Sequence, residues 1–234
     1  MEGKLTRKEL KTDRFAVAVE HQLDYVSLHR TQVVRYAVAA LAIVLIGAGI
    51  YLYRAHRRGV REEKLAEAIQ IQEAPIAPAA QPGALSFPTE DAKRAAAVKA
   101  FSGIATEYAG TNEGDIAENY LGAIAADGGK LDEARKRFQT TVDSGNKNYA
   151  SLAKLSLAQI DFFENRAPEA EKLLRNLIDN PTDLVSKQQA TIALARGIGK
   201  TKPAEARKLL EPLRTEAGAV SQAAINALSD LPSN

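Results

Sequence analysis

The sequence predicts an all-α protein in which a single transmembrane helix is followed by a linker and a solenoid of α-α hairpins. Three observations lead to this fold class. Residues 36–53 form an apolar run of 18 residues without a charge. From Thr89 onward, apolar and polar residues do not alternate as they do in strands, and short breakers separate blocks with helical spacing. A set of residues also recurs every 36 positions, which is typical of stacked repeats.

The first expected element is an amphipathic helix in the basic N-terminal tail, residues 1–32. Phe15, Val19, Leu23 and Val26 recur at helical spacing among polar residues, so their side chains share one face. Such a helix leads into the membrane either as a passive segment or as one that docks on a partner or lies on lipid. The spacing is compatible with both roles.

Residues 33–53 are expected to form the transmembrane helix. A helix of ~18–20 residues spans roughly 27–30 Å, about one hydrocarbon core. Tyr36, Tyr51 and Tyr53 stand at its two ends, where amphipathic rings prefer the membrane interface. A cleaved signal peptide would have a shorter apolar core and a small-residue cleavage site, and a buried core helix is seldom so uniformly apolar. The length of the run and the basic residues from Arg54 onward therefore favour an uncleaved anchor.

The charges beside the apolar run leave its orientation open. Five basic residues lie within residues 54–64, whereas only Arg30 and Arg35 closely precede the run. By the positive-inside rule, this difference places the C-terminal side in the cytoplasm. Further basic residues within residues 4–14 partly restore the balance, and long C-terminal domains can cross a membrane despite local charge.

Residues 54–88 are expected to hold a charged helix and then a linker. Helical spacing continues over residues 61–72, and residues 74–88 then carry four prolines and one glycine. Stretches rich in proline and alanine are extended, semi-rigid spacers. We therefore expect a linker that sets the soluble domain, residues 89–234, away from the bilayer.

Within residues 89–234, helical blocks of roughly 12–18 residues with short connections predict antiparallel hairpins. At an offset of 36 residues, Ala134, Ala170 and Ala206 fall together. Each alanine is followed four residues later by a large apolar residue and preceded twelve residues earlier by a residue on the first helix of its hairpin. The large residues are Phe138, Leu174 and Leu210, and the first-helix residues are Gly122, Ala158 and Leu194.

The recurring small residues indicate how the hairpins pack. A small residue lets two helices approach closely, and the Phe or Leu four positions after the shared alanine fills the groove against the next hairpin. Since no hairpin buries its apolar face alone, neighbouring hairpins must stack. Ala97 and Phe101 look like the second helix of an earlier, degenerate repeat. Its first helix is either the charged segment around residues 65–69 or missing.

Composition argues against several classes of function. Without cysteine, the chain has no disulfide, zinc–thiolate site or thiol nucleophile. His21, His29 and His56 lie outside the repeat domain and lack zinc-ligand spacing. No nucleophile with a base and an orienting group is visible, so we expect no enzyme, no cofactor and no metal. Residues 1–64 hold 12 of the 31 basic and 7 of the 29 acidic residues, which leaves the remainder with a net charge of −3 and disfavours nucleic acid as a partner.

The turn and second helix of the repeats resemble tetratricopeptide repeats. Residues 128–138, GGKLDEARKRF, show the Gly-Lys-x-x-Glu-Ala turn and the aromatic residue four positions after the alanine. Residues 165–174, NRAPEAEKLL, are a second good match. The third repeat departs from the pattern, because Leu194 replaces the small residue and the turn in residues 197–206 is altered.

The layout of basic tail, single span, linker and about three repeats resembles the YfgM-type ancillary subunits of the Sec translocon, over nearly the whole chain. That family is anchored in the inner membrane of Gram-negative bacteria. The resemblance implies a cytoplasmic N-terminus and a repeat domain in the periplasm. It also implies association with translocon subunits and with periplasmic chaperones of secreted proteins.

Protein binding is the remaining function, and the concave face of the hairpin stack is its expected site. The first helices of stacked hairpins line this face, where extended or helical peptides dock. By periodicity, the face comprises Asn119, Ala123, Leu155, Gln159, Phe162, Thr191, Ala195 and Ile198. Leu155 and Phe162 are alternatively ordinary core residues.

The sequence therefore favours a membrane-tethered scaffold or chaperone-type factor whose partners are translocon subunits, periplasmic chaperones or secreted clients. It contacts membrane lipid through the anchor. The alternative is an oligomerising structural factor of the cell envelope or of division, in which the repeats contact one another and bind no client.

Overall fold

The computed structural model describes residues 30–77, 85–144 and 146–232. The chain divides into two compact units, of which the first ends at Gly59 and the second begins at Val60. The amphipathic helix expected within residues 1–32 lies almost wholly outside the described residues.

Helix α2, Arg30–Glu73, contributes residues to both units. Among the described residues it is the one helix that is long and apolar enough to cross a membrane, with a window of mean hydropathy 2.1. No residue of this window is buried in the structure, which argues against a core helix. Leu41, Ile43 and Leu45 are each more than half exposed. An apolar surface so exposed is suited to lipid, so α2 is a candidate membrane anchor.

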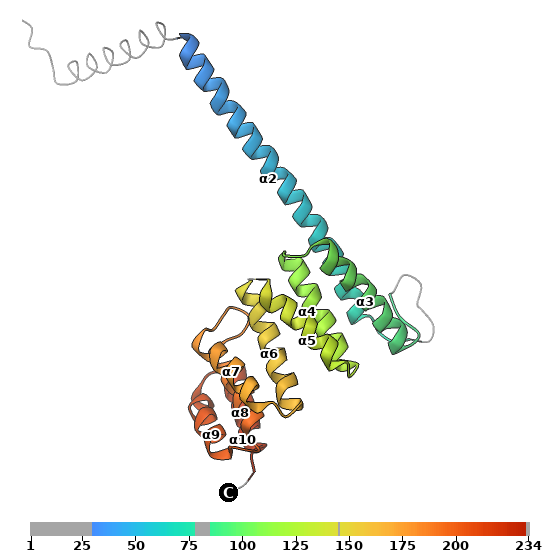
Figure 1. Cartoon of the computed structure of the whole chain (residues 1–234), viewed down its shortest axis with the longest axis vertical. Helices are drawn as coiled ribbons and strands as arrows, with labels where there is room; N and C mark the ends of the chain where they lie inside the picture. The colour runs from blue at the N-terminus through green and yellow to red at the C-terminus, as the bar shows by residue number, and fades with distance from the viewer. Residues whose placement is uncertain (1–29, 78–84, 145, 233–234) are drawn as a thin grey trace, which may run out of the picture. The chain divides into compact units, whose positions relative to one another are not determined.

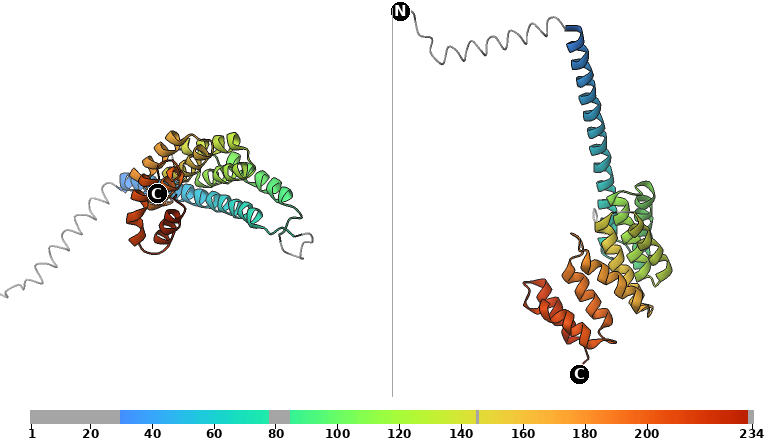
Figure 2. Two further views of the ribbon diagram at one scale, coloured as in Figure 1. Left: turned by 90° about the horizontal axis from the view of Figure 1, so that it is seen from below. Right: turned by 60° about the vertical axis from the view of Figure 1, so that its left-hand side comes forward.

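The second unit is a stack of helices joined by short connections (Figure 1). After α2 come α3 (Glu90–Glu107), α4 (Asn112–Asp127), α5 (Leu131–Asp143), α6 (Lys147–Phe163), α7 (Ala167–Asp179), α8 (Lys187–Ile198), α9 (Pro203–Leu210), the 3-10 helix η1 (Glu211–Thr215) and α10 (Ala219–Ser229). Each helix from α3 to α9 contacts the next, as the two views of Figure 2 also show. The part of the chain described contains a single isolated β-bridge and no strand, which confirms the all-α fold.

A second series of contacts distinguishes two kinds of helix in the stack. Helices α4, α6, α8 and α10 contact one another in order, in addition to their neighbours along the chain. These are the first helices of successive hairpins, and α5, α7 and α9 are the second helices. The first helices therefore form a continuous layer, as expected for stacked hairpins.

Hydrogen bonds pair the described residues at the two ends of the connection between α2 and α3. The amide of Ala77 donates to the carbonyl of Phe87 at 2.9 Å, and the amide of Phe87 donates to the carbonyl of Pro75 at 3.1 Å. The two ends of residues 74–88 are therefore paired side by side. An extended spacer was predicted from the prolines, whereas these hydrogen bonds bring Phe87 beside Pro75 and Ala77, just after the end of α2.

The end of α2 forms the first helix of the earliest repeat. Leu65 and Ala68 belong to the same buried cluster as Ala97 and Phe101 of α3. The ring of Phe101 stacks on Tyr120 of α4, with ring centroids 4.5 Å apart. Of the two alternatives left open by the sequence, the structure thus places the segment around residues 65–69 in this role. The compact unit begins at Val60 rather than at the expected residue 89.

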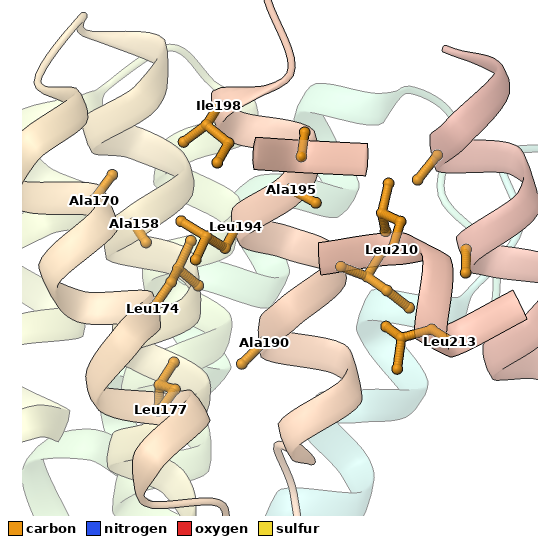
Figure 3. Close-up of a cluster of buried hydrophobic side chains, with 14 of the residues drawn as sticks. Ala158, Ala170, Leu174, Leu177, Ala190, Leu194, Ala195, Ile198, Leu210 and Leu213 are labelled. Carbon is orange, nitrogen blue, oxygen red and sulfur yellow. The ribbon is translucent and has the colours of Figure 1, made fainter. Parts of the chain in front are cut away.

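The residues that recur every 36 positions occupy the predicted core. Ala134, Ala170 and Ala206 are fully buried. A Cβ added to Gly122 would lie 2.7 Å from the Phe138 ring, so α4 and α5 approach as closely as they do because this residue is glycine. The largest buried cluster joins α6 to α10 and includes Leu174, Leu194 and Leu210 (Figure 3). The predicted packing of hairpin on hairpin is confirmed.

Ion pairs join the end of α2 to the helices beside it. Arg61 Nε donates to Glu113 Oε2 at 3.0 Å, and Lys64 Nζ donates to Glu107 Oε2 at 2.7 Å. The hydrogen bond that Lys64 donates to Glu107 and its contact with Tyr108 raise the pKa of Lys64 to about 12. Burial of Glu113 opposes its ionisation, but a backbone amide and Arg61 outweigh burial and hold its pKa below the usual value.

Acid should weaken the contact between α2 and α4. Because the pKa of Glu113 is lower in the folded protein than in the unfolded chain, its stabilising contribution is present above the unfolded pKa and is lost as the pH falls through the folded pKa. We expect Arg61→Met to lower the free energy of unfolding more at neutral pH than at about pH 3.5. Urea denaturation of the full chain in detergent, followed by circular dichroism, measures the difference. Arg94→Met, at an exposed pair with Asp91, is the control and should have little effect at either pH. An equal loss for Arg61→Met at both pH values would contradict the prediction.

Candidate protein-binding groove

A groove of about 750 Å³ lies on the layer of first helices, between α6, α8 and α10. Its apolar lining comes from Leu155 and Phe162 of α6, Ile192 of α8, and Val220 and Ala223 of α10. A volume of this size is in the range of ligand-binding clefts. The groove is therefore large enough to receive several side chains of a partner.

Two capped helix starts hold the walls of the groove. The side chain of Asn146 accepts hydrogen bonds from the amides of Asn148 and Tyr149 at the start of α6. The Ser186 hydroxyl accepts from the amide of Gln189, 3.1 Å away, at the start of α8. Such caps satisfy amides that have no partner within the helix, so they fix where each helix begins.

Phe162 lines the groove and packs closely against α8 at Gly197. A Cβ added to Gly197 would lie 2.1 Å from Cε2 of the Phe162 ring. Glycine at this position therefore leaves the space that the ring occupies beside the helix. The half-buried ring therefore belongs both to the groove lining and to the contact between α6 and α8.

Three polar side chains that line the groove have no hydrogen-bond or ion-pair partner among the described residues. Among the described residues, the side chains of Gln159, Gln189 and Arg196 have no hydrogen bond or ion pair with another side chain or with the backbone. Arg196 is exposed and is the only charged residue that lines the groove. Three side chains that can donate or accept hydrogen bonds thus converge on an apolar cleft, an arrangement typical of binding sites.

Leu155, Gln159 and Phe162, three residues expected on the concave face, line this groove. Thr191 lies in a different groove, which is formed by α7, α8, α9 and η1. Its hydroxyl donates to the carbonyl of Lys187 at 2.8 Å. The residues expected from α6 therefore line this groove, whereas the residues expected from α8 do not.

Ala195 and Ile198 are a correction to the predicted face, because both are fully buried. They belong to the same cluster as Ala224 and Ala227 of α10, which packs on α8. The offset of 36 residues carried the α6 face onto a side of α8 that is buried in this cluster. The groove residues of α8 are instead Gln189, Ile192, Ala193, Arg196 and Gly197.

Asn119 and Ala123 of α4 are not among the residues that line the groove. The Asn119 amide donates to the carbonyl of Asp115 at 3.0 Å, and Ala123 is exposed. The contribution of α10 was absent from the predicted site. Its signal in the sequence is the spacing of Val220, Ala224 and Ala227, which share one helical face.

Phe163 is a large exposed aromatic residue at the end of α6. It is 77% exposed, although its neighbour Phe162 lines the groove. The two rings leave the helix in different directions, as adjacent helical residues must. Over the described residues, no group of three or more His, Cys, Asp or Glu side chains is placed to hold a metal ion.

Replacing Gly197 with alanine should fill the groove and leave the fold intact. The added Cβ displaces the Phe162 ring, and this ring has the groove beside it to enter. The free energy of unfolding should change by less than about 1 kcal/mol, because the higher helix propensity of alanine offsets part of the displacement. Methyl NMR signals of Ile192 and Val220 should shift as the ring moves. Gly103→Ala, where nothing lies within 4 Å, is the control and should leave these signals unchanged.

A family model described as a tetratricopeptide repeat-like domain matches residues 31–180. The match covers α2 to α7, so it includes the apolar helix and the α6 wall of the groove. No curated protein and no solved structure matches the chain.

Proposed function

Because the chain belongs to the tetratricopeptide repeat-like family, we propose that it is a protein–protein interaction module that acts by binding and not by catalysis. The observation that carries this proposal is the groove between α6, α8 and α10. Its apolar lining surrounds Gln159, Gln189 and Arg196, whose polar groups have no partners within the described chain. A partner that covers the groove would bury the apolar surface and satisfy these groups.

The second part of the proposal is that α2 tethers the module to a membrane. The apolar window of α2 is wholly exposed, and Arg57 lies over the ring of Tyr53 at 5.9 Å. Tyrosine and arginine together are typical of the interface between hydrocarbon and water. We propose a single crossing that ends near these residues, with lipid as the surroundings of α2 within the bilayer.

The resemblance to YfgM-type subunits supports a compartment and a set of partners. We propose that the N-terminus lies in the cytoplasm and the helical stack in the periplasm of a Gram-negative bacterium. The partners would be translocon subunits, periplasmic chaperones or secreted clients. A tether beside the translocon would hold the groove close to chains as they emerge, which raises their effective concentration.

Photo-crosslinking from the groove tests the binding function. A photoreactive amino acid at Gln159, which is exposed within the groove, should give adducts with other proteins in cells. The same amino acid at Thr140, which is exposed on α5, is the matched control and should give few. Equal yields from both positions would count against the groove. Adducts with a second copy of the chain alone would favour the oligomerising structural factor.

A reporter fused after Asn234 tests the compartment separately. An enzyme that is active only in the periplasm should be active in this fusion, and one that is active only in the cytoplasm should be silent. Identification of the Gln159 adducts then tests the proposed partners. Adducts with cytosolic proteins alone, together with a silent periplasmic reporter, would overturn the proposed location and leave the binding function standing.

A further inference from the structure

The charge of the groove depends on a single side chain. Arg196 is its only charged lining residue, and neither a hydrogen bond nor an ion pair engages its guanidinium within the described residues. The surrounding lining is mainly apolar, so a partner that covers the groove also removes water from Arg196. A guanidinium that loses water without gaining an acceptor weakens binding by several-fold or more. A partner that fits this groove must therefore bring an acceptor to Arg196.

The other grooves of the stack differ from this one in how their arginines are used. Arg135 pairs with Asp161 at 2.9 Å and with Glu164 at 2.7 Å, in the groove between α5, α6 and α7. Arg175, in the groove beside α9, pairs with Glu205 at 2.6 Å. Both arginines are neutralised by the chain itself. Arg196 stands apart because no carboxylate among the described residues pairs with it, so a partner can supply its counter-charge.

A carboxylate is the acceptor that matches this side chain best. The planar guanidinium of arginine presents two parallel N–H groups that match the two oxygens of a carboxylate. Residues 65–234 carry a net charge of −3, which repels a partner with many acidic residues. The balance of charges thus fits one carboxylate among apolar side chains, and not an acidic tail or a polyanion.

The remaining lining fixes the rest of the partner's chemistry. Leu155, Ile192 and Val220 offer aliphatic contacts to a bulky apolar side chain. The amides of Gln159 and Gln189 each carry donors and an acceptor, which match the N–H and C=O groups of a peptide backbone. Peptide, apolar side chain and carboxylate can therefore be engaged together.

Resting on the proposed binding function, we propose that the groove between α6, α8 and α10 binds a peptide segment in which a bulky apolar residue neighbours an Asp or Glu. The apolar side chain packs on Leu155, Ile192 and Val220. The side-chain carboxylate pairs with Arg196. Recognition of this kind selects sequence, because a lysine at the acidic position would face Arg196 with a like charge.

A random peptide library displayed on phage tests the proposal. The immobilised protein is the full chain in nonionic detergent, and the same library is selected on Arg196→Glu, Leu155→Asp and Lys200→Glu. Wild type should enrich peptides with Leu, Ile, Phe or Met beside Asp or Glu. Arg196→Glu should bind these peptides about tenfold more weakly or worse, and should instead enrich Lys or Arg at the acidic position. Lys200→Glu makes the same change in charge at an exposed position just beyond α8 and should behave as wild type.

The outcomes separate this inference from the proposed function. Peptides that bind wild type, lose binding to Leu155→Asp and show no response to Arg196→Glu would overturn the acidic recognition and keep the groove as a binding site. Peptides that respond equally to Arg196→Glu and Lys200→Glu would also overturn it, because the effect would then be general charge. Selection of no peptide by wild type, or of peptides indifferent to Leu155→Asp, would count against the groove itself.

Discussion

Replacing Leu194 with alanine should lower the free energy of unfolding by about 2–5 kcal/mol, the usual loss for a leucine removed from a packed core. The repeat pattern alone would favour an unchanged or increased free energy of unfolding, because Gly122 and Ala158 hold the equivalent positions and both are small. The structure decides between them. Leu194 is fully buried in the cluster that joins α6 to α10, and Figure 3 shows it between α7 and α8 with Leu174.

Urea denaturation of the full chain in detergent measures the Leu194→Ala effect. Leu184→Ala removes the same atoms from a loop position that is 38% exposed, and should lower stability by well under half as much. An unchanged or increased stability for Leu194→Ala would mean that α8 can draw closer to α7 and close the space. The third repeat would then follow the small-residue pattern after all.

Replacing Gly114 with alanine should lower the free energy of unfolding by roughly 1–3 kcal/mol. Its added Cβ would lie 2.3 Å from the carbonyl oxygen of Tyr108, and this neighbour is backbone. Relief requires the connection between α3 and α4 to move, together with the Thr111 hydroxyl that accepts from the Gly114 amide. Thermal or urea denaturation of the full chain in detergent measures the loss.

Gly103→Ala is the matched control for Gly114→Ala and should have the opposite sign. Gly103 lies within α3, is exposed, and has nothing within 4 Å of the added Cβ. Alanine should therefore stabilise the helix by roughly 0.5–1 kcal/mol. A loss of stability at both positions would show that the space around the glycine does not determine whether alanine raises or lowers the free energy of unfolding.

The sequence predicted the hairpins well because their spacing is a direct consequence of close packing. Ala134, Ala170 and Ala206 had to be small for the second helices to approach the first, and all three are fully buried. The shared alanines also placed Phe138, Leu174 and Leu210 in the core. Local composition and tertiary packing agree at these positions, so periodicity alone was sufficient.

The linker and the places of five of the eight residues expected on the concave face could not be derived in the same way. Proline content indicates local stiffness, but the pairing of Ala77 with Phe87 depends on where α2 and α3 lie in the fold. Likewise, Ala195 and Ile198 are buried in a cluster that includes α10, and no repeat signature marked α10. A helix without a sequence counterpart changes which face of its neighbour is free.

The sharing of α2 between the two units limits how the protein can be shortened. A truncation that starts at Thr89 discards Leu65 and Ala68, which bury Ala97 and Phe101 together with α4. The apolar side of α3 would then be exposed to solvent, and fragments with such an exposed apolar surface are prone to aggregate. Cutting at Val60 keeps these contacts, so a soluble, well-behaved fragment should begin inside the long helix and not after the proline-rich loop.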